Sequence, residues 1–322
     1  METYRSGHNG ADSKSVCGQP HVGSNPTVSA NLGKALTGLA AFTATNKEVL
    51  SMEMLQNLHT HTIYCDGKNQ PEEMIRYAIE KGFDSLGFSG HSWMPFVQYA
   101  NISLENTEKY KDEIRMLKEK YRDELDIYLG LEVDVYSGVD VSDYDYIIGS
   151  VHFVKSADEY LEVDHSLENF KRIVKTNYGG NAVQFAKDYF ATVAQLPQYG
   201  TFDFIGHFDL ITKFIEVEPL FDQSCKEYLD SAYEAIDALK GKIPLFEVNT
   251  GAIARGYRTA PYPSIPLIKE FKRQDFGVVI TSDCHDGSQL DCNFKEVREL
   301  LMECGFKEKY VLTPSGFQAV AI

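Results

Sequence analysis

Six histidines of this chain follow short β-rich runs instead of lying within helical patterns: His59, His61, His91, His152, His207 and His285. His59–Thr60–His61 and Asp283–Cys284–His285 have an i, i+2 spacing, which in an extended chain turns both outer side chains to one face. Converging imidazole and carboxylate groups suit a borderline divalent cation such as Zn²⁺, Mn²⁺ or Fe²⁺. The pattern therefore predicts a metal site, whereas His165 is expected to be an ordinary surface residue.

A glutamate follows the third of these runs, in the segment GLEVDVYSG. The two carboxylate oxygens of Glu132 could bridge two cations, which makes it the natural link in a polynuclear cluster. Asp134 is the alternative, because it lies two residues later and on the same face of an extended chain. The apolar neighbours Leu131 and Val133 argue against an unremarkable surface glutamate.

The elements that must position these residues are strands that alternate with amphipathic helices. The expected strands cover residues 55–59, 85–89, 127–133, 146–152, 202–207, 244–249 and 277–283. In PEEMIRYAIEKG, Pro71 fits a helix start, Met74 and Ile75 share an apolar face, and Gly82 fits a C-cap. Strand followed by helix, about seven times, predicts an α/β barrel, whose active sites are built at the carboxyl ends of the strands. No GxGxxG motif opens the first unit, which disfavours a dinucleotide-binding fold.

Composition excludes several classes of protein. The 322 residues contain 31 Lys and Arg against 47 Asp and Glu, a net charge of −16, which disfavours a nucleic-acid partner. No run approaches the roughly 20 apolar residues of a membrane span, so no membrane partner is expected. The six cysteines form no CxxC pair, which indicates reduced thiols in the cytoplasm. Cys65 and Cys284 lie beside candidate ligands, and we interpret them as bystanders.

Residues 1–51 differ from the rest of the chain. They are rich in Gly, Ser, Asn and Pro and have no strand or helix period. We expect a disordered or spurious N-terminal extension, with translation starting at Met52 or Met54, and one catalytic domain over residues 52–322.

The ordered motifs NLHTHTIYCDGKNQPEEM, GFSGHSW, GLEVDV, YDYIIGSVHFV, FDFIGHFDLITKF and TSDCH resemble the polymerase-and-histidinol-phosphatase (PHP) superfamily, most closely its monofunctional histidinol-phosphate phosphatases. The resemblance covers about residues 54–320. It implies a distorted seven-stranded (β/α) barrel of the PHP type that holds two or three divalent metal ions. The implied reaction is hydrolysis of L-histidinol phosphate to L-histidinol and phosphate in histidine biosynthesis.

The resemblance also implies a set of metal ligands. One ion would be held by His59, His61, Glu132 and Asp283, and Glu132 would bridge to a second ion completed by His152 and His207. A third would be held by His91 and His285 with a ligand from the first loop, where many relatives carry a histidine and this chain offers Asp66. We take Glu132, Asp283 and His207 as the catalytic candidates.

Because the protein is strongly acidic, it can bind a negatively charged phosphate monoester only where positive charge is concentrated locally. Arg255 and Arg258 lie in the loop after the sixth strand, and arginine binds phosphate oxygens bidentately. The resemblance favours Arg255, and Lys213 is a third candidate. The expected step is in-line attack by a metal-bridging hydroxide, with the proton donor to the leaving group left open between His207, Asp209 and other groups.

Trp93, the tyrosines and the surplus acidic residues are candidates to contact the imidazole and the amine of such a substrate. Two alternatives stay open at this point. One is a PHP phosphoesterase acting on another small monoester or on nucleic-acid ends. The other is a catalytically silent metal-binding module.

Overall fold

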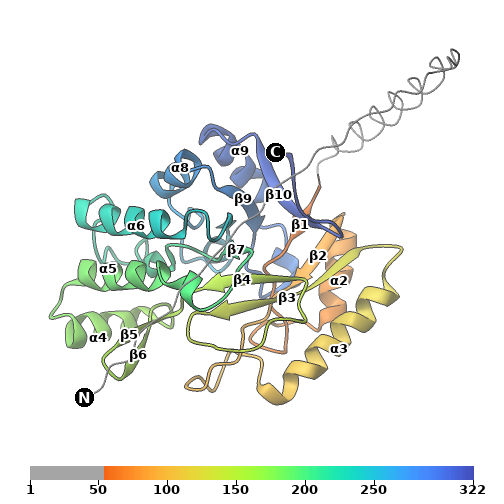
Figure 1. Cartoon of the computed structure of the whole chain (residues 1–322), viewed down its shortest axis with the longest axis horizontal. Coiled ribbons are helices and arrows are strands. Elements are labelled where there is room, and N and C mark those ends of the chain that lie inside the picture. Colours follow the sequence, from red (N-terminus) through yellow and green to blue (C-terminus); the bar gives the residue numbers. More distant parts are fainter. Residues whose placement is uncertain (1–53) are drawn as a thin grey trace, which may run out of the picture. The chain divides into compact units, whose positions relative to one another are not determined.

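The computed structural model describes residues 54–322 (Figure 1). The prediction of a disordered or spurious segment over residues 1–51 falls outside the described residues and stays a prediction. No helix within residues 54–322 combines the length and apolar character needed to cross a bilayer.

Seven parallel strands form the central sheet, in the order β1-β2-β3-β4-β7-β8-β9. They are β1 (Gln56–Asn57), β2 (Ser85–Phe88), β3 (Asp126–Asp134), β4 (Tyr146–Ser150), β7 (Phe204–Ile205), β8 (Leu245–Asn249) and β9 (Gly277–Thr281). Each lies within or near one of the seven expected runs, so the expected strands are confirmed. Several are shorter than expected, most of all β1 and β7, where the chain leaves the sheet to present histidines.

The sheet curls into a nearly closed barrel. Past the end of β9, the Cys284 amide donates to the carbonyl of His59 (3.0 Å), and the His61 amide donates to the carbonyl of Cys284 (2.8 Å). At the opposite end, Gln56 on β1 exchanges two side-chain hydrogen bonds with the backbone of Leu312, at 2.7 and 2.9 Å. Leu312 belongs to a C-terminal hairpin of β10 (Glu308–Thr313) and β11 (Gly316–Ala321) that the sequence analysis missed.

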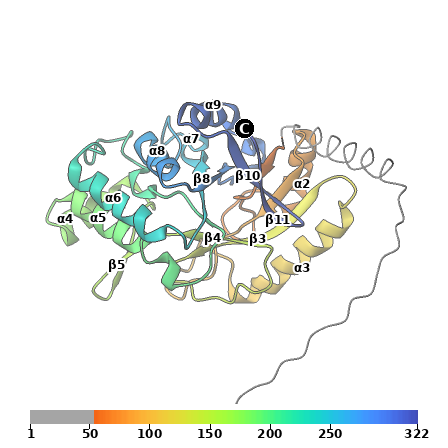
Figure 2. The same ribbon diagram turned by 45° about the horizontal axis from the view of Figure 1, so that its top comes forward.

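Helices surround the barrel, and Figure 2 places α4, α5 and α6 on one flank and α2 and α3 on the other. Their bounds are α2 (Pro71–Glu80), α3 (Leu104–Lys120), α4 (Leu167–Asn177), α5 (Ala182–Val193), α6 (Lys226–Leu239), α7 (Gly251–Ala254), α8 (Ile265–Arg273) and α9 (Phe294–Glu303). In α2, Pro71 occupies the first turn, Glu73 closes a capping box with Gln70, and Met74 and Ile75 are buried, as the sequence predicts.

A second missed hairpin follows β4, formed by β5 (Phe153–Ser156) and β6 (Glu159–Glu162). The expected strand over residues 146–152 ends at Ser150, because the His152 amide turns away to donate to Oδ2 of Asp134 (2.7 Å). Residues of this hairpin line the cavity described below.

The barrel interior is filled at the end away from the histidines. Tyr146 lies across it, and its hydroxyl donates to the carbonyl of Leu58 (2.5 Å). A Cβ at Gly130 or Gly87 would lie within 2.3 Å of the Tyr146 side chain, so the ring fits only because both positions lack one. The apolar cluster comprises Leu58, Tyr128, Tyr146, Ile148, Phe204, Leu245, Val279 and Leu312. Polar chemistry is thus confined to the other end.

Candidate metal centre

Glu132, at the carboxyl end of β3, lies at the centre of the histidine cluster. Its Oε2 is 2.7 Å from Nδ1 of His91 and 3.3 Å from Nε2 of His59. Its Oε1 is 2.8 Å from Nε2 of His207 and 3.5 Å from Nε2 of His152. Oε2 also lies 3.6 Å from Nε2 of His61, so each oxygen faces a different set of imidazoles, an arrangement in which one carboxylate can serve two cations.

Asp283 brings the last strand to the same cluster. Its Oδ1 lies 3.1 Å from Nε2 of His61 and 3.7 Å from Nε2 of His59. The sequence analysis attributed the shared direction of Asp283 and His285 to an extended strand, and this was wrong. β9 ends at Thr281, and Asp283 has a left-handed backbone with φ of 46°. A turn, and not an extended strand, brings these two side chains to the same cavity.

Asp66 joins a third group of potential ligands. Its Oδ2 lies 3.3 Å from Nε2 of His285, and its Oδ1 lies 3.6 Å from Nε2 of His91 and 3.7 Å from Nδ1 of His61. The loop can fold this tightly because residue 67 is glycine: a Cβ there would lie 2.4 Å from the His61 carbonyl. Asp66 therefore occupies the place in which the sequence analysis expected a loop ligand.

The carboxylates and imidazoles of the cluster hold one another in charged forms. Burial raises the pKa of Glu132 and Asp283, but neighbouring histidines, together with Arg255 for Asp283, outweigh burial and hold both pKa values well below the usual range. Burial lowers the pKa of His59, yet Glu247, Glu132 and Asp283 raise it well above 6.5. His61 differs: burial and the neighbouring His285 and His91 lower its pKa to about 3.

Buried atoms without hydrogen-bond partners point into the cluster. Nε2 of His59, Nε2 of His61 and Oε2 of Glu132 are all of this kind, and these side chains have no exposed surface. Leaving a buried polar atom unsatisfied costs roughly 1–3 kcal/mol, so three that converge on one place point to a bound ligand. Cations satisfy all three, and the residues present therefore fit a group of divalent metal ions.

Two cysteines beside the ligands stay outside these groups. Sγ of Cys65 lies 3.4 Å from Nδ1 of His61, and Sγ of Cys284 donates to the carbonyl of Asp286 at 2.9 Å. Burial raises the pKa of both thiols to about 12, so they stay protonated and are poor metal ligands. Both are placed as the bystanders that the sequence suggested.

Sequence reasoning missed a carboxylate behind the ligands. Oε2 of Glu247, on β8, lies 2.9 Å from Nδ1 of His59, and its Oε1 accepts a hydrogen bond from the backbone amide of His207 (2.5 Å). The signal was a glutamate in the otherwise apolar run of β8. Asp134 has a similar place, since its Oδ2 lies 3.3 Å from Nδ1 of His152, so it supports that histidine while Glu132 takes the central position.

The three candidate phosphate-binding cations lie in different surroundings. Arg255 is at the cluster, with Nη2 at 3.0 Å from Oδ2 of Asp283 and Nη1 at 3.0 Å from Nδ1 of His285. Lys213 lines the same cavity, but its Nζ is held by the backbone and carboxylate oxygens of Asp164, at 2.8 and 3.0 Å.

Arg258 is not brought to the cluster, contrary to the expectation. It is 6% exposed, bonds Oγ1 of Thr212, and lies over the ring of Tyr262 at 4.9 Å. The chain reverses between the two arginines at Gly256, whose φ is +74°, and this directs Arg258 into the protein interior. Asp209 is buried there too, with its Oδ2 accepting from the Ser264 amide, and it does not line the cavity.

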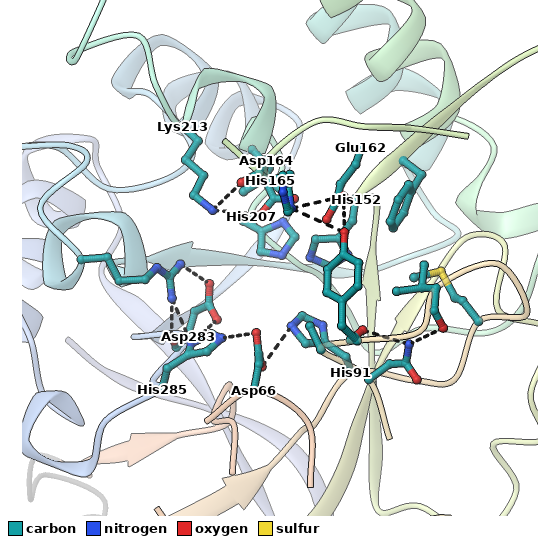
Figure 3. A pocket seen from close by; sticks show the side chains of 18 residues that line it. Asp66, His91, His152, Glu162, Asp164, His165, His207, Lys213, Asp283 and His285 are labelled. Atoms are coloured by element: carbon teal, nitrogen blue, oxygen red, sulfur yellow. Dashed lines mark hydrogen bonds and ion pairs between the residues drawn. The ribbon is translucent and has the colours of Figure 1, made fainter. Parts of the chain in front are cut away.

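A cavity of about 260 Å³ opens over the cluster (Figure 3). The figure shows Asp66, His91, Asp283 and His285 on one side, and Glu162, Asp164 and His165 on the other. At roughly 30 Å³ per water molecule, this volume suits a small molecule. His165, expected to be an ordinary surface residue, lines this cavity with a half-exposed side chain.

Comparison with known proteins decides the family. The model of the PHP domain matches residues 57–251, which is more than half of the chain. The chain belongs to the PHP domain family. A Deinococcus radiodurans relative named "Probable histidinol-phosphatase" is 29% identical over 77% of this chain and 95% of its own length. Histidinol-phosphatase of Bacillus subtilis is 27% identical over 72% of this chain and 94% of its own.

A solved structure has the same fold. The histidinol phosphate phosphatase of Lactococcus lactis, in complex with zinc, L-histidinol and phosphate, superposes with a TM-score of 0.63 at 21% identity. The match covers 82% of this chain and 98% of that one. The seven-stranded α/β barrel expected from the sequence is therefore confirmed.

Proposed function

We propose that this protein is a metal-dependent phosphomonoesterase that hydrolyses L-histidinol phosphate to L-histidinol and phosphate. The observation that carries the proposal is the convergence of Glu132 and Asp283 with six histidines under a small cavity that also holds Arg255. The names of the relatives from Deinococcus and Bacillus and the ligands of the Lactococcus structure support the choice of substrate.

The described residues offer several groups of ligands. In four overlapping sets their ligand atoms lie close together: His59, His61 and Asp283; His59, Glu132 and His207; His91, Glu132 and His152; and His61, Asp66, His91 and His285. We assign them to three sites, with Glu132, His207 and His152 at the second and Asp66, His91 and His285 at the third. We infer two or three divalent ions, zinc first because the Lactococcus structure contains zinc, with manganese or iron as alternatives. A cytoplasmic location fits five free cysteines among residues 54–322.

In this proposal the residues of the chain bind and orient the phosphate ester, and the cations supply electrophilic chemistry. Bound divalent ions would lower the pKa of a water molecule towards neutral pH and neutralise charge on the phosphoryl oxygens. Arg255 presents guanidinium nitrogens beside Asp283 and His285, where they can bind a phosphate oxygen that reaches the cluster. Glu132 and Asp283 are carboxylates held in the ionised form, ready to ligate.

The test is hydrolysis of L-histidinol phosphate by the purified full chain, assayed beside glycerol phosphate and single-stranded DNA, with metal analysis of the same sample. We expect histidinol phosphate to be preferred, chelation to abolish phosphate release, and added zinc or manganese to restore it. His59→Ala and Asp283→Ala should lower both bound metal and turnover, the latter by at least about 100-fold.

Asp286→Asn is the matched control, because Asp286 pairs with Lys68 at the surface and lies outside the ligand groups. Equal activity on all esters by the metal-loaded protein, or cleavage of DNA alone, would contradict the proposal.

A further inference from the structure

Glu162 lines the same cavity as Arg255, and the β5–β6 hairpin positions it near the candidate metal centre. Glu162 pairs with Phe153 across the hairpin, and Phe153 directly follows the ligand candidate His152. A further backbone hydrogen bond closes the base of the hairpin, since the Val163 amide donates to the carbonyl of His152 (2.9 Å). The place of Glu162 relative to the ligands is therefore set by backbone pairing and does not depend on a loose loop.

The Glu162 carboxylate contacts a tyrosine and a histidine. Its Oε2 accepts a hydrogen bond from the Tyr99 hydroxyl (2.6 Å) and lies 3.6 Å from Nδ1 of His165 (Figure 3). Its side chain is 21% exposed, and among residues 54–322 no lysine or arginine forms an ion pair with it. Burial and the charge of Asp164 raise the pKa of this carboxyl group, and together they outweigh the Tyr99 hydrogen bond and the nearby His165 and His152, which lower it.

The other carboxylates of the cavity differ in this respect. Asp164, two residues away, is paired with Lys213, and because that charge outweighs burial its pKa falls to about 2. Asp283 is paired with Arg255. Outside the ligand groups, the acidic side chains that line the described cavity are Glu162 and Asp164, and only Glu162 has no lysine or arginine partner.

The cavity thus has two unlike sides. Asp66, His91, Asp283 and His285 lie on one side, where Arg255 pairs with Asp283 and a phosphate group would bind, and the partly desolvated Glu162 lies on the other, near His152 and His207 (Figure 3). A carboxylate in such a place attracts a cation and repels an anion, and a charge-assisted hydrogen bond to it is stronger than a neutral one.

We propose that Glu162, held in place by Tyr99, is the specificity residue that binds the ammonium group of the substrate. This inference rests on the proposed function and narrows it: the site selects phosphate monoesters that carry a positive charge on the alcohol portion, and it discriminates against neutral and anionic esters. Tyr99 acts as a positioning residue, because its hydroxyl fixes the carboxylate that makes the contact.

The test compares two esters in Glu162→Gln. Glutamine keeps the shape and an acceptor for Tyr99 but removes the charge. We expect KM for L-histidinol phosphate to rise about 10–100-fold, as for loss of a charge-assisted contact, while kcat/KM for glycerol phosphate and the metal content stay unchanged. Glu159→Gln is the matched control on the same hairpin, since Glu159 is exposed and contacts Asn177.

A fall of the same size for both esters would overturn the inference, because Glu162 would then matter for folding or metal binding. If Glu162→Gln does not fold, Tyr99→Phe replaces it, with a smaller rise in KM expected for the cationic ester alone. A wild-type protein that hydrolyses histidinol phosphate no better than glycerol phosphate would overturn the proposed function. An intact preference that survives in Glu162→Gln would overturn only the role of Glu162.

Discussion

Oε2 of Glu247 lies 2.9 Å from Nδ1 of His59, and both side chains are completely buried. This contact fixes which nitrogen of the imidazole carries the proton, since a carboxylate accepts a hydrogen bond only from Nδ1–H. Nε2 faces Glu132 and Asp283, and its lone pair becomes available to a cation that displaces the Nε2 proton. In the proposed metal site, Glu247 would therefore orient His59 as a ligand without itself contacting the metal ion.

Glu247→Gln should weaken metal binding more than it weakens the fold. An amide N–H directed at Nδ1 would favour the tautomer that carries its proton on Nε2, which removes the donor lone pair. We expect the apparent zinc affinity to fall about 10–100-fold, measured by titration with a competing chelator. Thr281→Val is the matched control, because it removes another hydrogen bond to the same Oε2 (2.7 Å) and leaves the tautomer unchanged. Equal losses in both variants would contradict this account.

The clustering of the candidate ligands could be predicted from the sequence because their signal is local. A strand ends, a histidine follows, and the fold brings strand ends together, so His152 and His207 could be placed without coordinates. The role of Glu247 could not, since its partner His59 is 188 residues away along the chain. Arg258 was misplaced because the reversal at Gly256 depends on backbone geometry that the residue pattern does not reveal.

Arg255→Ala should impair phosphate binding. Removing the guanidinium takes away charge next to the cluster, so KM and the inhibition constant for inorganic phosphate should both rise, by about 10–100-fold. Metal content should change less, because Oδ1 of Asp283 still faces His61 and His59 when its Oδ2 loses Arg255. Unchanged inhibition by phosphate would remove Arg255 from the phosphate site.

Arg258→Ala should instead act on stability. Arg258 is buried against Tyr262, and its charge acts on the buried Asp209, whose pKa burial raises and Arg258 lowers. Arg258 also forms an ion pair with the partly exposed Glu216 (3.6 Å), and its loss would leave the buried Asp209 without this positive charge, so we expect a cost of about 3–5 kcal/mol. Urea unfolding should detect this loss, while KM at a temperature where the variant is folded should match the wild type. The two arginine variants are thus controls for each other.

Gly130→Ala tests the packing of the barrel interior. The new Cβ would lie 2.2 Å from Cζ of Tyr146, closer than any real contact, so the ring must move. We expect a loss of about 1–3 kcal/mol in the free energy of unfolding. Gly200→Ala is the control, because its nearest neighbour would lie at 3.5 Å. The penalty should shrink when Tyr146→Leu is also present, and a penalty independent of residue 146 would refute the explanation.

Lys309 on β10 should make stability rise with pH above neutrality. It is 4% exposed, its Nζ donates to the carbonyl of Met54 (2.7 Å), and burial together with the charge of Arg298 lowers its pKa to about 8. The unfolded chain keeps the ordinary pKa of about 10.4, so between pH 8 and that value the unfolded state binds more protons than the folded one. The penalty for burying the charge is therefore present at neutral pH and disappears as pH rises.

Lys309→Met removes that titration. The free energy of unfolding of the wild type, relative to this variant, should increase by roughly 2–3 kcal/mol between pH 7 and pH 10, measured by urea unfolding at each pH. Lys307→Met is the matched control, because Lys307 is exposed two residues earlier in the chain and should leave the pH slope unchanged. If the slope is the same in the wild type and in Lys309→Met, a group other than Lys309 causes the pH dependence, and the prediction is wrong.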